Sequence, residues 1–167
     1  MKPLARYTAV LAAAAMALSA LPAAAQNAGQ IAHARAGASC PRCNLFQADF
    51  GSQEMKGRNF AGARLRQADL SASVMNRTNF AGGDLRDMNA YGGVFTGANF
   101  GGANLTNATF VGAYLQGANF RGAILDGVNF SGAEMDHAVG LTQGQLRNAC
   151  GDEATTLPRG LRLRRCD

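Results

Sequence analysis

The residues with the greatest chemical potential in this chain are four cysteines, placed as two close pairs. Cys40 and Cys43 form a Cys-Pro-Arg-Cys motif, and Cys150 and Cys166 lie near the C-terminus. A Cys-x-x-Cys motif is typical of redox-active dithiols and of zinc sites, whereas an even number of cysteines in an exported chain indicates disulfides. The choice among these chemistries depends on the elements that position the two pairs.

Other side chains with catalytic potential are few. The two histidines are His33 and His137, and neither has a cysteine or a second histidine at a metal-ligand spacing. Ser71, Ser73 and Ser131 have no plausible general base. The acidic residues recur at fixed places in a repeat, where a short side chain that accepts hydrogen bonds has a structural use. We therefore expect no enzyme activity, no cofactor and no bound metal.

The elements that must position these residues come from a repeat of five residues. In each unit a small residue, usually Ala, is followed by a short polar residue, often Asn or Asp, and then by a large apolar residue; Gly is frequent two residues later. No α-helix or flat strand has a period of five, so the pattern predicts a solenoid of short extended segments and bends. The positions of the large residue, where Ala90 is the one exception, hold Leu45, Phe50, Met55, Phe60, Leu65, Leu70, Met75, Phe80, Leu85, Ala90, Phe95, Phe100, Leu105, Phe110, Leu115, Phe120, Leu125, Phe130 and Met135.

The unit resembles the signature of the pentapeptide-repeat family over residues 43–137, which hold nineteen consecutive units. The resemblance implies an all-β fold, a right-handed four-sided parallel β-helix in which four units make one square coil. The sequence supports four units per coil by itself, because every fourth unit carries the same large residue. Such series are Phe60, Phe80, Phe100 and Phe120, with Asn59, Asn79, Asn99 and Asn119 beside them as an expected amide ladder, and Leu45, Leu65, Leu85, Leu105 and Leu125.

Three units depart from the pattern. Ala90 replaces a large residue while Met88 fills the small position of the same unit, so we expect an exchange of volumes that keeps the interior filled. Gln53 and Arg58 bring polar groups to inward positions of the first coil. A buried unpaired guanidinium is costly, which favours an irregular first coil at Arg58. The sequence leaves open whether these two side chains point inward.

Residues 1–25 resemble a secretory signal peptide. Lys2 and Arg6 precede an Ala-rich apolar run over residues 8–21, and residues 23–25 offer a cleavage site of small residues. The run is too short for a membrane-spanning helix, and the sequence offers no other candidate. We therefore expect a periplasmic or secreted protein with no membrane span after cleavage of the signal peptide.

Export makes disulfides the favoured chemistry of the cysteines. The nineteen units make nearly five coils, or a rod ~23 Å long at the spacing of stacked strands. This rod separates the first cysteine pair from the second, and bonded cysteines have Cα atoms within ~7 Å of each other. We expect Cys40–Cys43 and Cys150–Cys166 bridges, unless a tail folds back along the rod. The same separation disfavours a single four-cysteine zinc site, and a redox motif would normally open a helix next to a strand.

Two terminal regions flank the rod. Residues 26–42 are small and polar, and we expect a flexible lead-in that carries the Cys-x-x-Cys motif. Residues 138–167 are expected to form a helical cap and a tail tied by the second disulfide. Thr142 and Gln145 match a capping box, and Leu141 and Leu146 match the hydrophobic staple around it, which predicts a short helix at about 142–149.

The charges argue against nucleic acid as a partner. Residues 26–167 carry fourteen Arg and Lys and eleven Asp and Glu, whereas the rod carries seven and eight, so the basic excess lies in the flanks. The basic tail has no interleaved aromatic residues, which favours a solvated terminus. Some pentapeptide-repeat proteins resemble duplex DNA and inhibit DNA gyrase. That alternative function requires a negative, cytoplasmic rod and is disfavoured here.

The best candidate binding surface is an apolar cluster on the rod. With twenty residues per coil, Val74, Val94 and Tyr114 stack on one face, and Tyr91 stacks over Val111 at the neighbouring corner. Exposed apolar clusters mark interaction sites, and tyrosine is a frequent interface anchor. Valine and tyrosine also favour extended chain, which is the competing explanation. We predict an exported structural or protein-interaction module whose partner is an envelope protein, cell-wall material or a second copy, with no small-molecule substrate.

Overall fold

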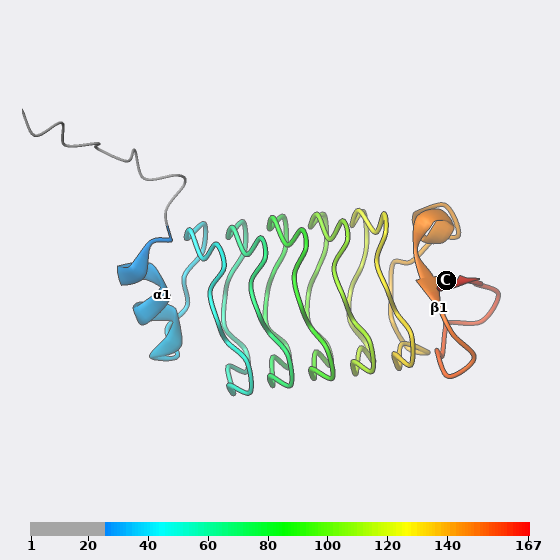
Figure 1. The fold of residues 1–167 in the computed structure, drawn as a ribbon, viewed down its shortest axis with the longest axis horizontal. Helices are drawn as coiled ribbons and strands as arrows, with labels where there is room; N and C mark the ends of the chain where they lie inside the picture. Colours follow the sequence, from blue (N-terminus) through cyan, green and yellow to red (C-terminus); the bar gives the residue numbers. More distant parts are fainter. Residues whose placement is uncertain (1–25) are drawn as a thin grey trace, which may run out of the picture.

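The computed structural model describes residues 26–167, so the expected signal peptide lies outside the described residues. Figure 1 shows a rod of stacked coils, with helix α1 (Ala28–Arg35) at one end. The other end carries the 3-10 helix η1 (Gln145–Asn148) and two short strands, β1 (Cys150–Gly151) and β2 (Arg164–Arg165). Over the described range, no helix combines the length and the apolar character needed to cross a membrane.

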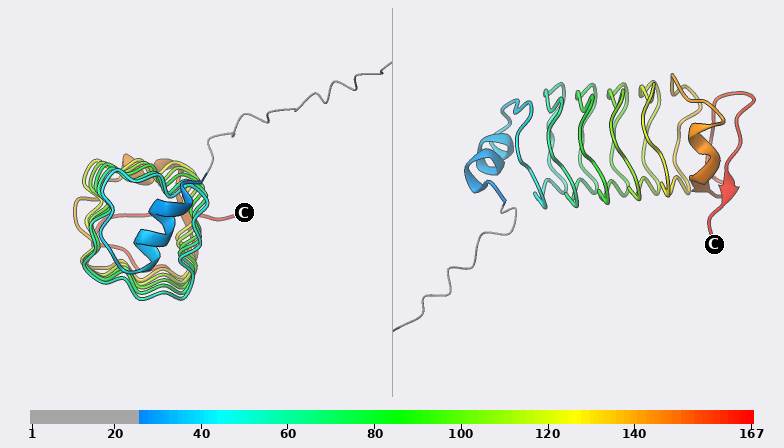
Figure 2. Two further views of the ribbon diagram at one scale, coloured as in Figure 1. Left: turned by 90° about the vertical axis from the view of Figure 1, so that its left-hand side faces the viewer. Right: turned by 90° about the horizontal axis from the view of Figure 1, so that it is seen from above.

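Successive coils pair through single parallel bridges between residues twenty positions apart, such as Val74 with Val94 and Asn79 with Asn99. Bridges recur every five residues, once on each side of the square outline that Figure 2 shows along the rod. The predicted four units per coil are therefore present. Single bridges form in place of long strands because the chain bends again within a few residues.

Each bend is closed by a hydrogen bond from the small residue of one unit to the large residue before it. The N–H of Ala98 donates to the carbonyl of Phe95 at 2.9 Å, and Gly97 between them has a φ of +67°. A turn with positive φ at its third residue favours glycine there. This requirement explains the frequent glycine two residues after the large apolar residue.

The sides of the square differ in the residue that points outward just before each buried large residue. Two neighbouring sides matter for function. The valine–tyrosine face consists of Glu54, Val74, Val94, Tyr114 and Glu134, and the asparagine face consists of Asn59, Asn79, Asn99, Asn119 and Val139.

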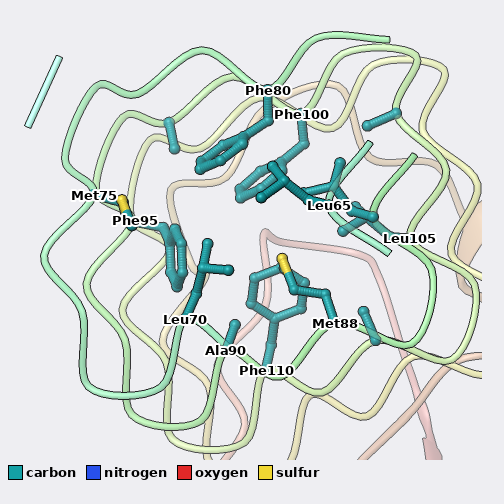
Figure 3. Packing of buried hydrophobic residues seen from close by; sticks show 14 of the residues in the cluster. Leu65, Leu70, Met75, Phe80, Met88, Ala90, Phe95, Phe100, Leu105 and Phe110 are labelled. Atoms are coloured by element: carbon teal, nitrogen blue, oxygen red, sulfur yellow. The ribbon is translucent and has the colours of Figure 1, made fainter. Parts of the chain in front are cut away.

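Stacked large side chains fill the interior of the coils. The rings of Phe80 and Phe100 lie 5.2 Å apart and within 4° of parallel, and the rings of Phe100 and Phe120 are also 5.2 Å apart. In Figure 3, Met88 points into the interior near Ala90, and both residues are buried. The predicted exchange of volumes in that unit is confirmed.

The first coil is irregular at Arg58, whose side chain is exposed and lies beside Gly37. The regular turn would pair the carbonyl of Met55 with the N–H of Arg58. That carbonyl accepts instead from the hydroxyl of buried Thr78 in the next coil, at 2.9 Å. Arg58 thus avoids burial, while Gln53 is half-buried and keeps its turn.

The N-terminal flank differs from the flexible lead-in expected for residues 26–42, because residues 28–35 form α1. The side chains of Ile31 and Ala34 are buried and belong to the same core as the coils. Asn27 caps the helix by accepting from the N–H of Gln30 at 3.1 Å. An Asn-x-x-Gln spacing is a capping signal, but the small polar composition around it concealed the helix.

Helix α1 supplies hydrogen-bond partners to the open edge of the first coil. The side-chain carbonyl of Gln30 accepts from the N–H of Asn44 at 2.6 Å, and the Arg35 Nε donates to the carbonyl of Asp49 at 2.8 Å. Unpaired strand edges promote aggregation. The flank is therefore an N-terminal cap.

The C-terminal cap contains the predicted capping box. The N–H of Thr142 donates to Gln145 Oε1 at 2.9 Å, and the N–H of Gln145 donates to Thr142 Oγ1 at 3.3 Å. The helix itself is shorter than the predicted range of about 142–149, because only Gln145–Asn148 is helical. The chain must leave the helix at once, since Cys150 bridges to Asn129 and resumes the coil.

Candidate functional site

The catalytic candidates of the sequence are scattered along the rod. His33 lies in α1, whereas His137 lies at the other end, where its Nδ1 is 2.7 Å from a carboxylate oxygen of Asp136. Ser73 is buried and donates to the carbonyl of Leu70 at 2.7 Å. Among residues 26–167, no three or more His, Cys, Asp or Glu side chains are grouped to hold a metal ion.

The cysteines form two separate structural bridges. Cys40 is bonded to Cys43 and Cys150 to Cys166, the pairing that the rod geometry predicts. The first bridge is buried in the initial coil, where Cys40 is 4% and Cys43 9% exposed. The second bridge is only partly buried. The two bridges tie chain segments together at the two ends of the rod, and no cysteine among residues 26–167 is a free thiol.

The outward position before each large residue has a structural preference for Asn or Asp. Its side-chain oxygen accepts from the backbone N–H two residues later, as Asn59 does from Ala61 at 3.0 Å and Asp69 does from Ser71 at 2.9 Å. This bond belongs to the Asx turns that these side chains favour. The repeat therefore gains a backbone hydrogen bond wherever this position is Asn or Asp.

The asparagine face uses this position in four successive coils. The amide of Asn79 donates to Asn59 at 3.3 Å, that of Asn99 to Asn79 at 3.2 Å, and that of Asn119 to Asn99 at 3.0 Å. The predicted amide ladder is confirmed. Every asparagine of the ladder also accepts the backbone bond of its own turn.

The valine–tyrosine face has no Asn or Asp at this position in any of its five coils. The three other sides of the square each hold several. The side chains of the valines and the tyrosine cannot accept a hydrogen bond from the backbone N–H two residues later. The N–H of Thr96 donates instead to the Oδ1 of Asn76 in the preceding coil, at 3.1 Å. The sequence already contains this departure. It becomes visible when the residues just before the large apolar residues are grouped at intervals of twenty, one group for each side of the square.

The valine–tyrosine face exposes a continuous apolar surface. Tyr114 is 44% exposed and lies next to Val94, which lies next to partly buried Val74. Tyr91, 59% exposed, and partly buried Val111 adjoin this stripe at the corner. The structure thus gathers all five predicted interface residues. The other exposed large apolar residues among residues 26–167, Ile124 and Val139, lie singly on different sides.

Polar groups border the apolar stripe at both ends. Glu54 lies 2.6 Å from the Lys56 ammonium at the N-terminal end, and Glu134 accepts from the Gln116 amide at 2.6 Å at the C-terminal end. A shallow groove of about 420 Å³ follows the adjoining corner, and its walls are Lys56, Gly57, Asn76, Arg77 and Thr96. An apolar centre with a polar rim is the usual anatomy of a protein interface.

A bidentate ion pair lies on another side of the square, away from the valine–tyrosine face. The Arg86 guanidinium donates to both carboxylate oxygens of Asp84, at 2.7 and 2.8 Å. The hydrogen bond from Arg86 lowers the pKa of Asp84 below its ordinary value. This carboxylate is therefore charged at neutral pH.

The family model for pentapeptide repeats matches the chain in eight copies, over residues 54–89, 84–122, 94–132 and 113–150. No match was found among curated protein sequences. These matched segments include the whole valine–tyrosine face and the asparagine ladder.

Several solved structures are similar to the chain. HetL, a pentapeptide repeat protein involved in heterocyst differentiation regulation from the cyanobacterium Nostoc sp. strain PCC 7120, is 32% identical over 59% of this chain and 49% of that chain, with a TM-score of 0.31. A pentapeptide repeat protein from the Arabidopsis thaliana thylakoid lumen is 26% identical over 62% of this chain and 61% of that chain, with a TM-score of 0.31. QnrB1, a plasmid-mediated fluoroquinolone resistance protein, is 18% identical over 77% of this chain and 87% of that chain, with a TM-score of 0.32. The chain thus spans about half of HetL.

Proposed function

Because the chain belongs to the pentapeptide-repeat family, we propose that it is a rigid, non-enzymatic right-handed rod that binds a protein partner through its valine–tyrosine face. The rod holds the face flat and fixed, since Val74, Val94 and Tyr114 are each joined by parallel bridges to the coils on either side. A preformed surface loses little conformational entropy on binding.

One observation carries this proposal: the valine–tyrosine face lacks Asn and Asp at the polar position in every coil. A protein hydrogen bond contributes roughly 0.5–1.5 kcal/mol of stability, so each valine or tyrosine there replaces a residue that would stabilise the turn. Strand propensity alone does not explain why such replacements fill one side of the square. Sites where a sequence departs from what its fold favours are expected to be functional.

We further propose that the protein works outside the cytoplasm. The signal-peptide pattern of residues 1–25 supports export, and the two disulfides suit an oxidising compartment. The rod itself is nearly neutral, with seven basic and eight acidic residues over 43–137. A DNA-mimicking inhibitor needs a strongly negative surface, so nothing in this charge pattern favours that function.

Site-specific photo-crosslinking in cells tests the proposal. A photo-reactive residue in place of Tyr114 is expected to give a discrete adduct, whose mass identifies the partner. The matched control places the probe at Arg121, an exposed position at the far corner of the asparagine face. Cell fractionation of the same strains checks export. Adducts from both positions, or from neither in a correctly exported protein, would contradict binding through the valine–tyrosine face.

A further inference from the structure

Arg77 is a cation beside the valine–tyrosine face. It lines the groove at the corner, and no ion pair joins it to a carboxylate in the part of the chain that the structure describes. Its φ is +57°, and the equivalent positions one coil before and one coil after are Gly57 and Gly97. Seven other non-glycine residues of the described range share a positive φ, so this conformation is tolerated at the turns of the rod. The stem of Arg77 lies over Gly97, where a Cβ atom would be only 3.5 Å from it.

The opposite end of the same face is acidic. Glu134 ends the face, and Asp136 follows at the same corner as Arg77 but three coils further along the rod. The Glu134 carboxylate accepts from Gln116, and that of Asp136 contacts His137; neither is paired with Lys or Arg among residues 26–167. Because Lys56 is already paired with Glu54, Arg77 is an open positive charge at the N-terminal end of the face. The face thus carries opposite charges at its two ends, about 14 Å apart at the spacing of stacked strands.

We propose that a second copy of this chain is the partner of the valine–tyrosine face and binds it in antiparallel orientation, an inference that rests on the proposed function. The two-fold axis passes between the coil of Val94 and the coil of Tyr114, perpendicular to the rod. Val94 then faces the partner's Tyr114, and Arg77 faces the partner's Asp136. A two-fold interface makes each of these contacts twice.

The placement of two apolar pairs and one charged pair favours this arrangement because each pair is matched about one midpoint; Val74 then lies opposite the partner's Glu134. Val94 and Tyr114 flank it by half a coil spacing each, as do Tyr91 and Val111 at the corner. Arg77 and Asp136 flank it by one and a half coil spacings. An unrelated partner would not require such symmetry, whereas an isologous dimer requires self-complementary surfaces.

A parallel arrangement is disfavoured by the same residues. With the two-fold axis along the rod, Glu54 and Glu134 would each face their own counterparts, which places like charges together. Arg77 would face the other corner of the partner, where the residues of its coil are Ser71 and Ala72. The antiparallel arrangement alone satisfies the open cation.

Sedimentation equilibrium of the exported, disulfide-bonded protein tests the dimer. The face is only five coils long, so we expect weak association, with the mass rising from one copy toward two between about 1 μM and about 1 mM. Arg77→Glu and Asp136→Arg should each weaken association at least tenfold, because each places like charges in contact. The two changes combined in one chain should restore association, because each cation then faces an anion again. Added salt should weaken the wild-type dimer.

Arg121→Glu is the matched control, because it makes the same change of charge at an exposed position away from the interface. It should leave association unchanged, and melting curves of all variants check that the fold is retained. A wild-type protein that stays monomeric at about 1 mM, or a double variant as weak as the single ones, would overturn the second-copy proposal. A Tyr114 probe that forms an adduct with a different protein, in a yield that Arg77→Glu does not change, would also overturn the second-copy proposal. That result would leave the proposed binding function standing.

Discussion

The valine–tyrosine face and the asparagine face lie side by side on the same coils, and parallel bridges between successive coils run beneath both. On the asparagine face, each outward side chain bonds to its own turn and to the next coil. On the valine–tyrosine face, Val74, Val94 and Tyr114 make neither bond. The comparison shows that one side of the square uses its outward side chains to stabilise the rod, and it supports our proposal that the other side binds a partner.

The buried residues beneath the two faces should contribute equally to stability. Their substitution should have the largest effect on the free energy of unfolding. Phe95 lies beneath the valine–tyrosine face and Phe100 beneath the asparagine face, and both are fully buried. Phe95→Ala and Phe100→Ala should each lower the free energy of unfolding by about 3–5 kcal/mol, through lost burial and the cavity left behind. Urea denaturation followed by circular dichroism measures both. A much smaller loss for Phe95→Ala would show that the coils are unequal inside, and the comparison of their outer faces would fail.

The next largest effect should come from the asparagine ladder. Asn99→Val removes the bond to the N–H of Gly101 and the bonds to Asn79 and Asn119. We expect a loss of about 1–3 kcal/mol in the free energy of unfolding, given the worth of individual hydrogen bonds. Asn99→Asp is the matched variant, because it keeps the turn acceptor but loses the amide donor, and it should cost less. An Asn99→Val protein as stable as wild type would mean that the ladder does not stabilise the rod.

The reverse exchange should have a small effect on stability. Val94→Asn places the preferred residue of the repeat on the valine–tyrosine face, where its side chain can accept from the N–H of Thr96. That N–H already donates to Asn76, so we expect a change within about 1 kcal/mol, neutral or stabilising. Thermal unfolding compares the two proteins. A loss well above this range would show that Val94 is needed for the fold, and would undermine its assignment to binding.

The smallest effect should come from the Asp84–Arg86 pair on another side of the square. The pKa of Asp84 in the folded protein lies below the ordinary value of 3.8. The stability that the pair contributes is therefore present above pH 3.8 and is lost as the pH falls through the folded pKa of Asp84. The pair is largely solvated, so its contribution to the free energy of unfolding is small. Wild type and Asp84→Asn should therefore differ slightly and constantly between about pH 5 and pH 8 and converge in acid. A difference that grows in acid would contradict the lowered pKa.

Much of the fold could be predicted because the large apolar residue of each repeat unit is the one that the coil buries. Large residues recur every fifth position and like residues stack after twenty, so the Phe and Asn series fixed the square coil. The exchange of Met88 and Ala90 followed from conserving volume. The capping box at Thr142 and Gln145 also formed, because its signal is local.

The N-terminal cap could not be predicted from composition. Helix α1 buries Ile31 and Ala34 only because the first coil offers an open end, and no residue within the helix encodes that contact. Its Gln30 and Arg35 bond to backbone groups of Asn44 and Asp49, far along the chain. The path of Arg58 depends in the same way on Thr78, which satisfies the carbonyl that Arg58 leaves free.

The candidate site was half visible in the sequence. The period of twenty residues placed Val74, Val94 and Tyr114 on one side, but strand propensity explained them equally well. The missing turn bond favours the binding explanation, and it became visible only once the backbone N–H groups that donate to the Asn and Asp side chains were known. The sequence likewise does not show that Arg77 lines a groove beside the valine–tyrosine face, or how far it lies from Asp136.

The most direct test of the account is the adduct yield from a photo-reactive probe at Tyr114, measured in Val94→Asn and Asn99→Val backgrounds at equal protein levels. The account predicts that Val94→Asn, despite its unimpaired stability, loses most of the adduct, while Asn99→Val, although less stable, keeps it. This result holds for any partner, including a second copy. Equal yields, or a loss confined to Asn99→Val, would contradict the division of the rod into a stabilising face and a binding face.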